Sequence, residues 1–124
     1  MTELGAFCTC LIDFFEDISS TYSEEPKLAS ATNALKLLKK ANPRMIYNYF
    51  MKDVYTEFRD PILAKNEALI LRRAHEILSS EYADINYAFW IFDKHWKDMT
   101  DSNKDAIWKH MQVLVILAGK VSPT

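Results

Sequence analysis

Apolar residues recur along most of this chain at steps of three and four, the spacing that lines one face of an α-helix. The first such series comprises Leu4, Phe7, Cys8, Leu11, Phe14, Phe15, Ile18 and Tyr22. It predicts a helix over about residues 3–22. No segment alternates apolar and polar residues as a half-buried strand does, so the pattern indicates an all-α protein.

Capping residues predict where the second and third helices begin. Ser23 can cap a helix whose first turn contains Pro26, with a buried stripe formed by Leu28, Ala31, Leu35 and Leu38. Asn42 followed by Pro43 has the same form, a cap and a first helical residue. The stripe of this third helix consists of Tyr47, Phe50, Val54 and Phe58.

The start of the fourth helix has two alternatives in the sequence. Asp60-Pro61 repeats the signal of a cap followed by proline, whereas Asn66 could instead cap a helix that begins at Glu67. The second alternative leaves residues 61–66 as an irregular link. In both cases we expect the helix to continue to about Ser79.

The last two helices contain the most apolar part of the chain. Asp84 can cap the fifth helix, whose helical period includes Ile85, Phe89, Phe92, Trp96 and Met99. Thr100 can cap the sixth, which we expect to end with Gly119 in the left-handed conformation. Because its segment MQVLVILA is apolar on nearly every side, this helix should be central. The chain is thus predicted to be a compact single-domain bundle of five or six helices over residues 1–124, with a buried C-terminal helix.

Composition agrees with this fold and indicates a compartment. A chain of 124 residues with 49% hydrophobic residues, two glycines and four prolines can form one core. Cys8 and Cys10 would lie about 200° apart on a helix, so they cannot form an unstrained disulfide with each other, which favours a reducing compartment. The N-terminus lacks the pattern of a signal peptide, and no apolar run reaches the length of a membrane span. We expect a soluble, cytoplasmic protein without a membrane partner.

Charge is unevenly distributed along the chain, although the net charge is only −2. Residues 1–25 carry six acids and no base, whereas residues 26–59 carry seven bases and two acids. Such asymmetry indicates either that the two segments pack together or that each faces a different partner. We favour the first interpretation, because it requires no external partner.

Catalytic and metal-binding patterns are weak. Five possible metal ligands are close in sequence: Asp93, His95, Asp98, Asp105 and His110. Only His95 and Asp98 have a spacing that lets both bind one metal ion from a helix. There is no Gly-rich phosphate loop and no nucleophile motif. We expect no enzyme activity, no cofactor, no bound metal, and see no indication of a small-molecule substrate.

Two groups of residues are candidates for binding macromolecules. The first is the basic cluster Lys36, Lys39, Lys40 and Arg44, which could contact the phosphates of a nucleic acid. An isoelectric point near 5.9 disfavours that interpretation.

The second group is formed by tryptophans. Trp90 would share a helix side with Lys94 and Lys97, and Trp108 would lie beside its own helix's inner stripe, so both could be exposed, whereas Trp96 should be buried. An exposed indole can anchor a protein interface. We therefore predict a noncatalytic protein-interaction module or assembly component that contacts a protein partner or a second copy through Trp90 or Trp108. A nucleic-acid-associated accessory protein is the alternative.

Two segments also carry a resemblance to a known group of proteins. NPRMIYNYF followed by VYTEFRDPIL, and the closing NKDAIWKHMQVLVILA, resemble small uncharacterised helical proteins encoded by large nucleocytoplasmic DNA viruses. The resemblance covers roughly residues 42–118. It implies an infection-associated role in the host cytoplasm, and it transfers no activity and no functional residue.

Overall fold

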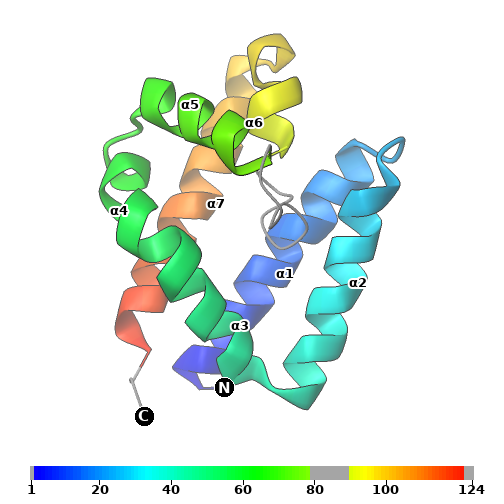
Figure 1. Ribbon diagram of the computed structural model, residues 1–124, viewed down its shortest axis with the longest axis vertical. Helices are drawn as coiled ribbons and strands as arrows, with labels where there is room; N and C mark the ends of the chain where they lie inside the picture. The colour runs from blue at the N-terminus through cyan, green and yellow to red at the C-terminus, as the bar shows by residue number, and fades with distance from the viewer. Residues whose placement is uncertain (1, 79–89, 122–124) are drawn as a thin grey trace.

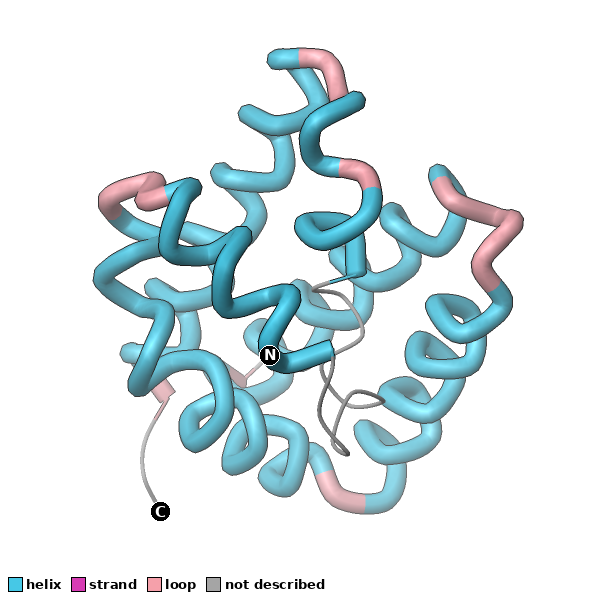
Figure 2. The backbone as a smooth tube through the Cα atoms, turned by 45° about the horizontal axis from the view of Figure 1, so that its top comes forward, coloured by secondary structure: helices cyan, strands magenta, loops and turns pink. Residues whose placement is uncertain are grey.

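The structure is a computed structural model that describes residues 2–78 and 90–121. These residues form helices joined by short turns, and none of them lies in a strand, as Figure 2 shows. The helices are α1 (Glu3–Thr21), α2 (Pro26–Ala41), α3 (Pro43–Phe50), the π-helix η1 (Met51–Tyr55), α4 (Thr56–Leu63), α5 (Glu67–Leu78), α6 (Trp90–Lys94), the 3-10 helix η3 (Trp96–Asp98) and α7 (Asp101–Lys120). The predicted all-α bundle is confirmed.

Side-chain caps fix several of the helix starts. The hydroxyl of Thr100 accepts a hydrogen bond from the amide of Asn103 at 3.2 Å, as the sequence indicates. The prediction for α2 is wrong by two residues, because Glu25 rather than Ser23 is the cap. Its carboxylate accepts from the amide of Lys27 at 3.2 Å, and Pro26 takes the first helical position, where no amide hydrogen is needed.

The chain from α3 to α4 is one continuous helical stretch, so Asp60-Pro61 lies inside a helix and does not start one. The reversal comes instead at Lys65, which has a φ of 54°, in the left-handed region. Asn66 then accepts a hydrogen bond from the amide of Leu69 at 3.3 Å at the start of α5. The predicted start of the fourth helix at Glu67 is therefore confirmed, but the predicted irregular link 61–66 is wrong in its first half, because residues 61–63 belong to α4.

The π-helix η1 keeps one apolar stripe aligned along this stretch. Phe50, Val54, Phe58 and Ile62 follow one another at intervals of four. In a regular α-helix each such interval overshoots a full turn by about 40°, so the stripe would drift around the helix. A π turn contains more residues than an α turn, so each residue rotates the chain less and the stripe stays closer to one direction. Phe50, Phe58 and Ile62 are all buried as a result.

Helix α1 lies next to α2, with α4 and α5 on the opposite side of the bundle, as Figure 1 shows. It forms an antiparallel pair with α2 and also packs against α3 and α7, while α4 packs against α7 and α5, and α5 against α6. The C-terminal helix α7 is buried along one face, formed by Trp108, Met111, Leu114, Val115 and Ala118. The opposite face of α7 is not buried, although its sequence is apolar there, because Val113 is 47% and Ile116 49% exposed.

Gly119 does not end α7 in the left-handed conformation, which corrects the sequence-based expectation. The helix continues to Lys120, and no glycine of the described residues has a positive φ. A Cβ atom at position 119 would lie 3.0 Å from the hydroxyl of Tyr55. Gly119 thus lets α7 approach the π-helix closely.

An aromatic cluster joins α6, η3 and α7. The Trp96 ring stacks on Phe92 with centroids 4.8 Å apart and meets Trp108 edge-on at 5.6 Å. Its indole N–H donates to a carboxylate oxygen of Glu67, and only 1% of Trp96 is exposed, which confirms that it is buried. The helical period predicted through Met99 breaks at His95, where a 3-10 turn follows α6. The predicted Asp84 cap and the stripe positions Ile85 and Phe89 lie outside the described residues.

The buried face of α7 yields a stability prediction. Leu114→Ala should lower the free energy of unfolding by about 2–5 kcal/mol, because Leu114 is 3% exposed and its truncation leaves a void. Val113→Ala, in the same helix but on the exposed face, should change it by less than about 0.5 kcal/mol. Chemical denaturation followed by circular dichroism measures both. Equal effects of the two variants would contradict the assigned face of α7.

Candidate functional site: an apolar pocket

The structure does not place Trp108 at the surface. It is 6% exposed and packs against Trp96, so the prediction of an exposed Trp108 is wrong. The physical reason is the Trp96 ring on η3, which packs edge-on against Trp108 from another helix. The side chain of Trp90 lies outside the described residues. A partner contact through Trp108 has no support in this arrangement.

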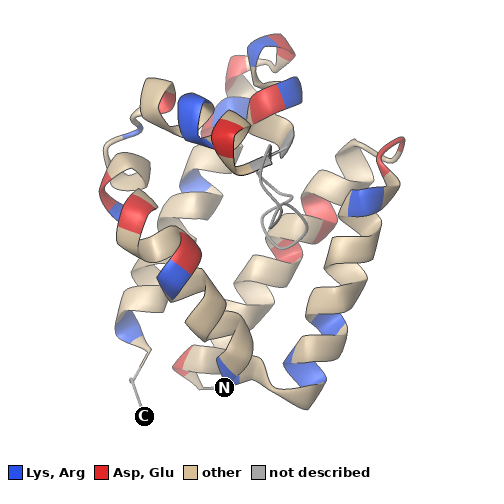
Figure 3. Ribbon diagram, in the orientation of Figure 1, with Lys and Arg blue, Asp and Glu red and all other residues tan. Residues whose placement is uncertain are grey.

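The basic cluster lies against α1 along part of its length. Lys36 forms an ion pair with Glu16, and the Lys39 amine donates to the hydroxyl of Thr9 at 2.9 Å. The Arg44 guanidinium lies 5.3 Å from the ring centroid of Tyr47. Of the four candidate residues, Lys40 is exposed on α2 with no such contact to α1 given by the structure. Figure 3 shows this acidic and basic pair of helices side by side, which favours packing as the reason for the charge asymmetry.

The acidic and histidine side chains considered for a metal are separated in space. His95 stacks on Tyr22 with centroids 4.4 Å apart, and Asp93 accepts a hydrogen bond from Nδ1 of His75 at 3.0 Å. Nε2 of His110 donates to the carbonyl oxygen of Cys10, also at 3.0 Å. Within residues 2–78 and 90–121 no three His, Cys, Asp or Glu side chains are placed to hold one metal ion.

Neither cysteine is an activated nucleophile. Burial raises the pKa of the Cys8 thiol, and the nearby Lys39 and Arg44 offset only part of this rise. Burial also raises the pKa of Cys10, with a further contribution from Asp13. Since the thiolate is the reactive form, both groups are poorly suited to covalent catalysis near neutral pH.

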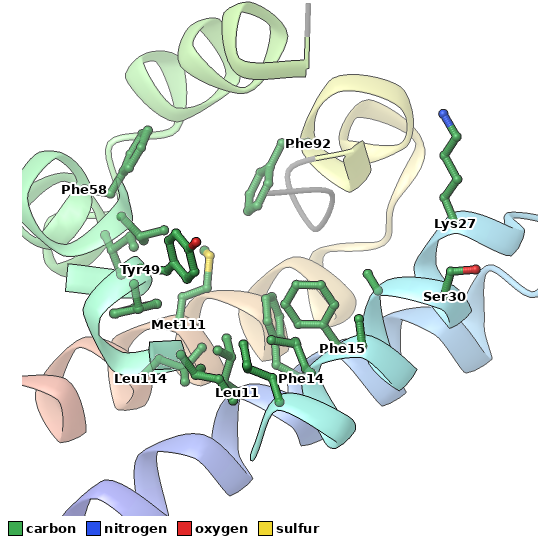
Figure 4. Close-up of a pocket in the computed structure, with 18 of the residues that line it drawn as sticks. Leu11, Phe14, Phe15, Lys27, Ser30, Tyr49, Phe58, Phe92, Met111 and Leu114 are labelled. Carbon is green, nitrogen blue, oxygen red and sulfur yellow. The ribbon is translucent and has the colours of Figure 1, made fainter. Parts of the chain in front are cut away.

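An apolar pocket with a volume of about 530 Å³ lies among the helices. Side chains from α1 to α7 line it, as Figure 4 shows. Leu11, Phe14 and Phe15 of α1 form one side. Phe58 and Ile62 of α4, together with Ile70 of α5 and Phe92 of α6, contribute to the rest of the wall. These residues belong to the core cluster, whereas other lining residues are exposed, so the pocket reaches from the surface into the core.

Small residues on α2 form another part of the wall. Ala31 and Ala34 lie between the larger lining residues Lys27 and Leu38 in the sequence of α2. At each alanine the lining side chain ends at Cβ, so the space in front of the helix is not filled from this side. The apolar stripe predicted for α2 thus faces the pocket along much of its length.

Polar groups are few in the pocket. Lys27 and Ser30 lie on α2, at the side of the pocket opposite Phe58 in Figure 4, and Tyr49 contributes a phenol. Lys27 is the charged residue among the described ones that line the cavity. No carboxylate or imidazole from the described part of the chain joins it, so the lining offers no acid–base pair for catalysis. An apolar cavity with a few polar groups on one side is instead suited to binding.

The pocket was not identified from the sequence, although many of its lining residues belong to the predicted apolar stripes. A side chain that faces a cavity and one that faces a neighbouring helix follow the same helical spacing. Ala31 was the available signal, since it is a small side chain in a stripe that otherwise consists of leucines.

Comparison of the chain with protein-family models, curated proteins and solved structures gives no match. The resemblance to proteins of large nucleocytoplasmic DNA viruses therefore stays a prediction. No helix among the described residues combines the length and the apolar character required to cross a bilayer.

The cysteine environments predict slow alkylation in the folded protein. At neutral pH, iodoacetamide should modify both thiols more slowly than in the denatured chain, because their raised pKa values reduce the thiolate fraction. Cys8 should react more slowly than Cys10, because Cys8 is fully buried. Peptide mapping by mass spectrometry measures the two rates, and the denatured protein provides the control. A Cys8 that reacts faster when folded would contradict its assigned environment.

Proposed function

We propose that this protein is a noncatalytic binding module that holds an apolar chain, such as the hydrocarbon tail of an amphiphile, in its central pocket. The observation that carries the proposal is the 530 Å³ cavity with almost entirely apolar walls. Ligand pockets in proteins typically have volumes of about 300–1,000 Å³ and are lined mainly by hydrophobic and aromatic residues. The lining by Phe14, Phe15, Phe50, Phe58 and Phe92 fits this description.

The size of the cavity supports a ligand rather than a packing defect. Protein interiors are close-packed, and voids larger than a water molecule are few. An engineered apolar cavity of roughly 150 Å³ is already large enough to bind benzene. The pocket here is several times larger, and each methylene group that it removes from water contributes about 0.8 kcal/mol. A hydrocarbon chain gains affinity from every carbon that enters.

The position of the polar lining groups supports an amphiphile as the ligand. Lys27 and Ser30 lie together in the first part of α2, away from the aromatic side chains of α4 and α6 (Figure 4). Both residues are exposed at this rim. A polar head group can therefore stay in water beside them while the tail occupies the space between Phe15 and Phe58.

Nucleic-acid binding receives less support from the same geometry. Basic side chains bind a nucleic acid by neutralising its phosphates, which releases the counterions of the nucleic acid. The side chains must therefore be accessible to the phosphates. The carboxylate of Glu16, on the neighbouring helix α1, lies beside Lys36 and would repel a phosphate there, and Lys39 donates to Thr9 of the same helix. We therefore favour the pocket over the basic cluster as the functional site.

Chain-length dependence tests the proposal. Dodecanoic acid should bind at least about tenfold more tightly than hexanoic acid, because the longer tail buries more methylene groups. Isothermal titration calorimetry measures both, and dodecanol, which has the same tail without the charge, separates the tail from the head group. Binding of neither long-chain compound would refute the proposal.

A variant that fills the pocket provides the matched test. Ala34→Phe places a ring into the cavity from α2 and should weaken dodecanoic acid binding at least about tenfold, while thermal unfolding shows that the fold is kept. Ala29→Phe adds the same ring to an exposed position of α2 outside the pocket and should leave the affinity unchanged. Equal affinities of the two variants would place the bound molecule elsewhere.

A further inference from the structure

A second hollow lies between α4 and α7, outside the proposed ligand pocket. Its volume is about 290 Å³, and Tyr55, Arg59, Leu63, Ile116, Gly119 and Lys120 are among the residues that line it. Leu63 is 38% and Ile116 49% exposed, so apolar side chains face water at its edge. Val113, three residues before Ile116 and 47% exposed, extends the same apolar surface along α7.

Among the described residues, the two charged side chains that line this hollow are basic. Arg59 comes from α4 and Lys120 from the last turn of α7. Arg59 is paired with its neighbour Asp60, but that carboxylate side chain is 85% exposed, and such a surface pair competes only weakly with a new partner. Lys109, exposed one turn before Val113, adds a third cation along the same helix. The surface thus combines exposed apolar side chains with a basic border.

A second copy of the chain is a poorer match than an acidic partner. The exposed acids of α1, among them Asp13 and Asp17, have no large exposed apolar side chain on the same helix. The exposed apolar residues Leu37, Met45 and Tyr49 lie in the helices that carry the basic cluster. The surface between α4 and α7 has the exposed acids Asp60 and Asp105, but a second copy would also bring its own Arg59, Lys109 and Lys120 to the interface. An acidic partner brings no such like charges.

We propose that the surface between α4 and α7 docks an acidic amphipathic helix of a partner protein. An apolar side chain of that helix enters the hollow between Leu63 and Ile116. Carboxylates next to it in the partner lie against Arg59 and Lys120. An amphipathic helix that presents its apolar side to a groove is a common mode of peptide recognition.

A pair of synthetic peptides tests this surface directly. One is an amphipathic helix with a leucine stripe bordered by glutamates, and the other has lysines in place of the glutamates. The glutamate peptide should bind, should shift the amide resonances of residues 55–63 and 113–120, and should bind more weakly as salt is added. Equal binding of the lysine peptide, no binding of the glutamate peptide, or shifts confined to other helices would overturn the proposal.

Substitutions at the surface between α4 and α7, with a control at the exposed Leu37 of α2, complete the test. Ile116→Asp should weaken glutamate-peptide binding at least about tenfold without loss of the fold, because Ile116 is half exposed. Arg59→Glu should weaken it similarly and reduce its salt dependence. Leu37→Asp, at the most exposed of the large apolar residues, is the control and should have no effect. A wild-type dimer in sedimentation that Ile116→Asp dissociates would assign the surface to a second copy instead. Retained dodecanoic acid binding by Ile116→Asp separates this surface from the pocket.

Discussion

The apolar face of α1 is the surface on which the other helices assemble. It packs against α2, α3 and α7, whereas α4 and α5 are held through α7 and through each other. Leu11 and Phe14 of α1 line the same pocket as Phe58 and Ile62 of α4, a helix that is held mainly through α7 and α5. The apolar composition of the pocket walls follows from the place of these residues in the core.

Local signals explain which parts of the fold were predictable from the sequence. Helical spacing identified α1 and α7, and the caps Thr100 and Asn66 act within one turn of their own position, so neighbouring residues suffice to recognise them. The break at His95 and the burial of Trp108 depend instead on side chains that meet from different helices. Spacing within one helix carries no information about a ring that covers it from another. The cap of α2 was displaced for a local reason, since Pro26 at the first helical position leaves Glu25 as the capping residue.

The two candidate surfaces differ in how far the sequence pointed to them. The basic cluster was visible as a series of charges, but its pairing with Glu16 and Thr9 requires the antiparallel arrangement of α1 and α2. The sequence contains almost no sign of the pocket, because most residues of its walls follow the same apolar spacing as ordinary core residues. Ala31 interrupts the leucine stripe of α2, but a small residue in such a stripe indicates close helix packing as readily as a cavity. A cavity is a property of the distances between helices, which no single periodicity encodes.

The π-helix η1 accommodates one additional residue in the stretch from α3 to α4. Without one residue of Met51–Tyr55, Phe50 and Phe58 would be seven residues apart, a spacing that a regular α-helix keeps within about 20° of one direction. With that residue, the π turn absorbs the extra length, and Phe58 and Ile62 stay on the side of the cavity. Related chains with and without the additional residue would therefore present the same wall to a bound molecule, and a difference in length at this place leaves the pocket unchanged.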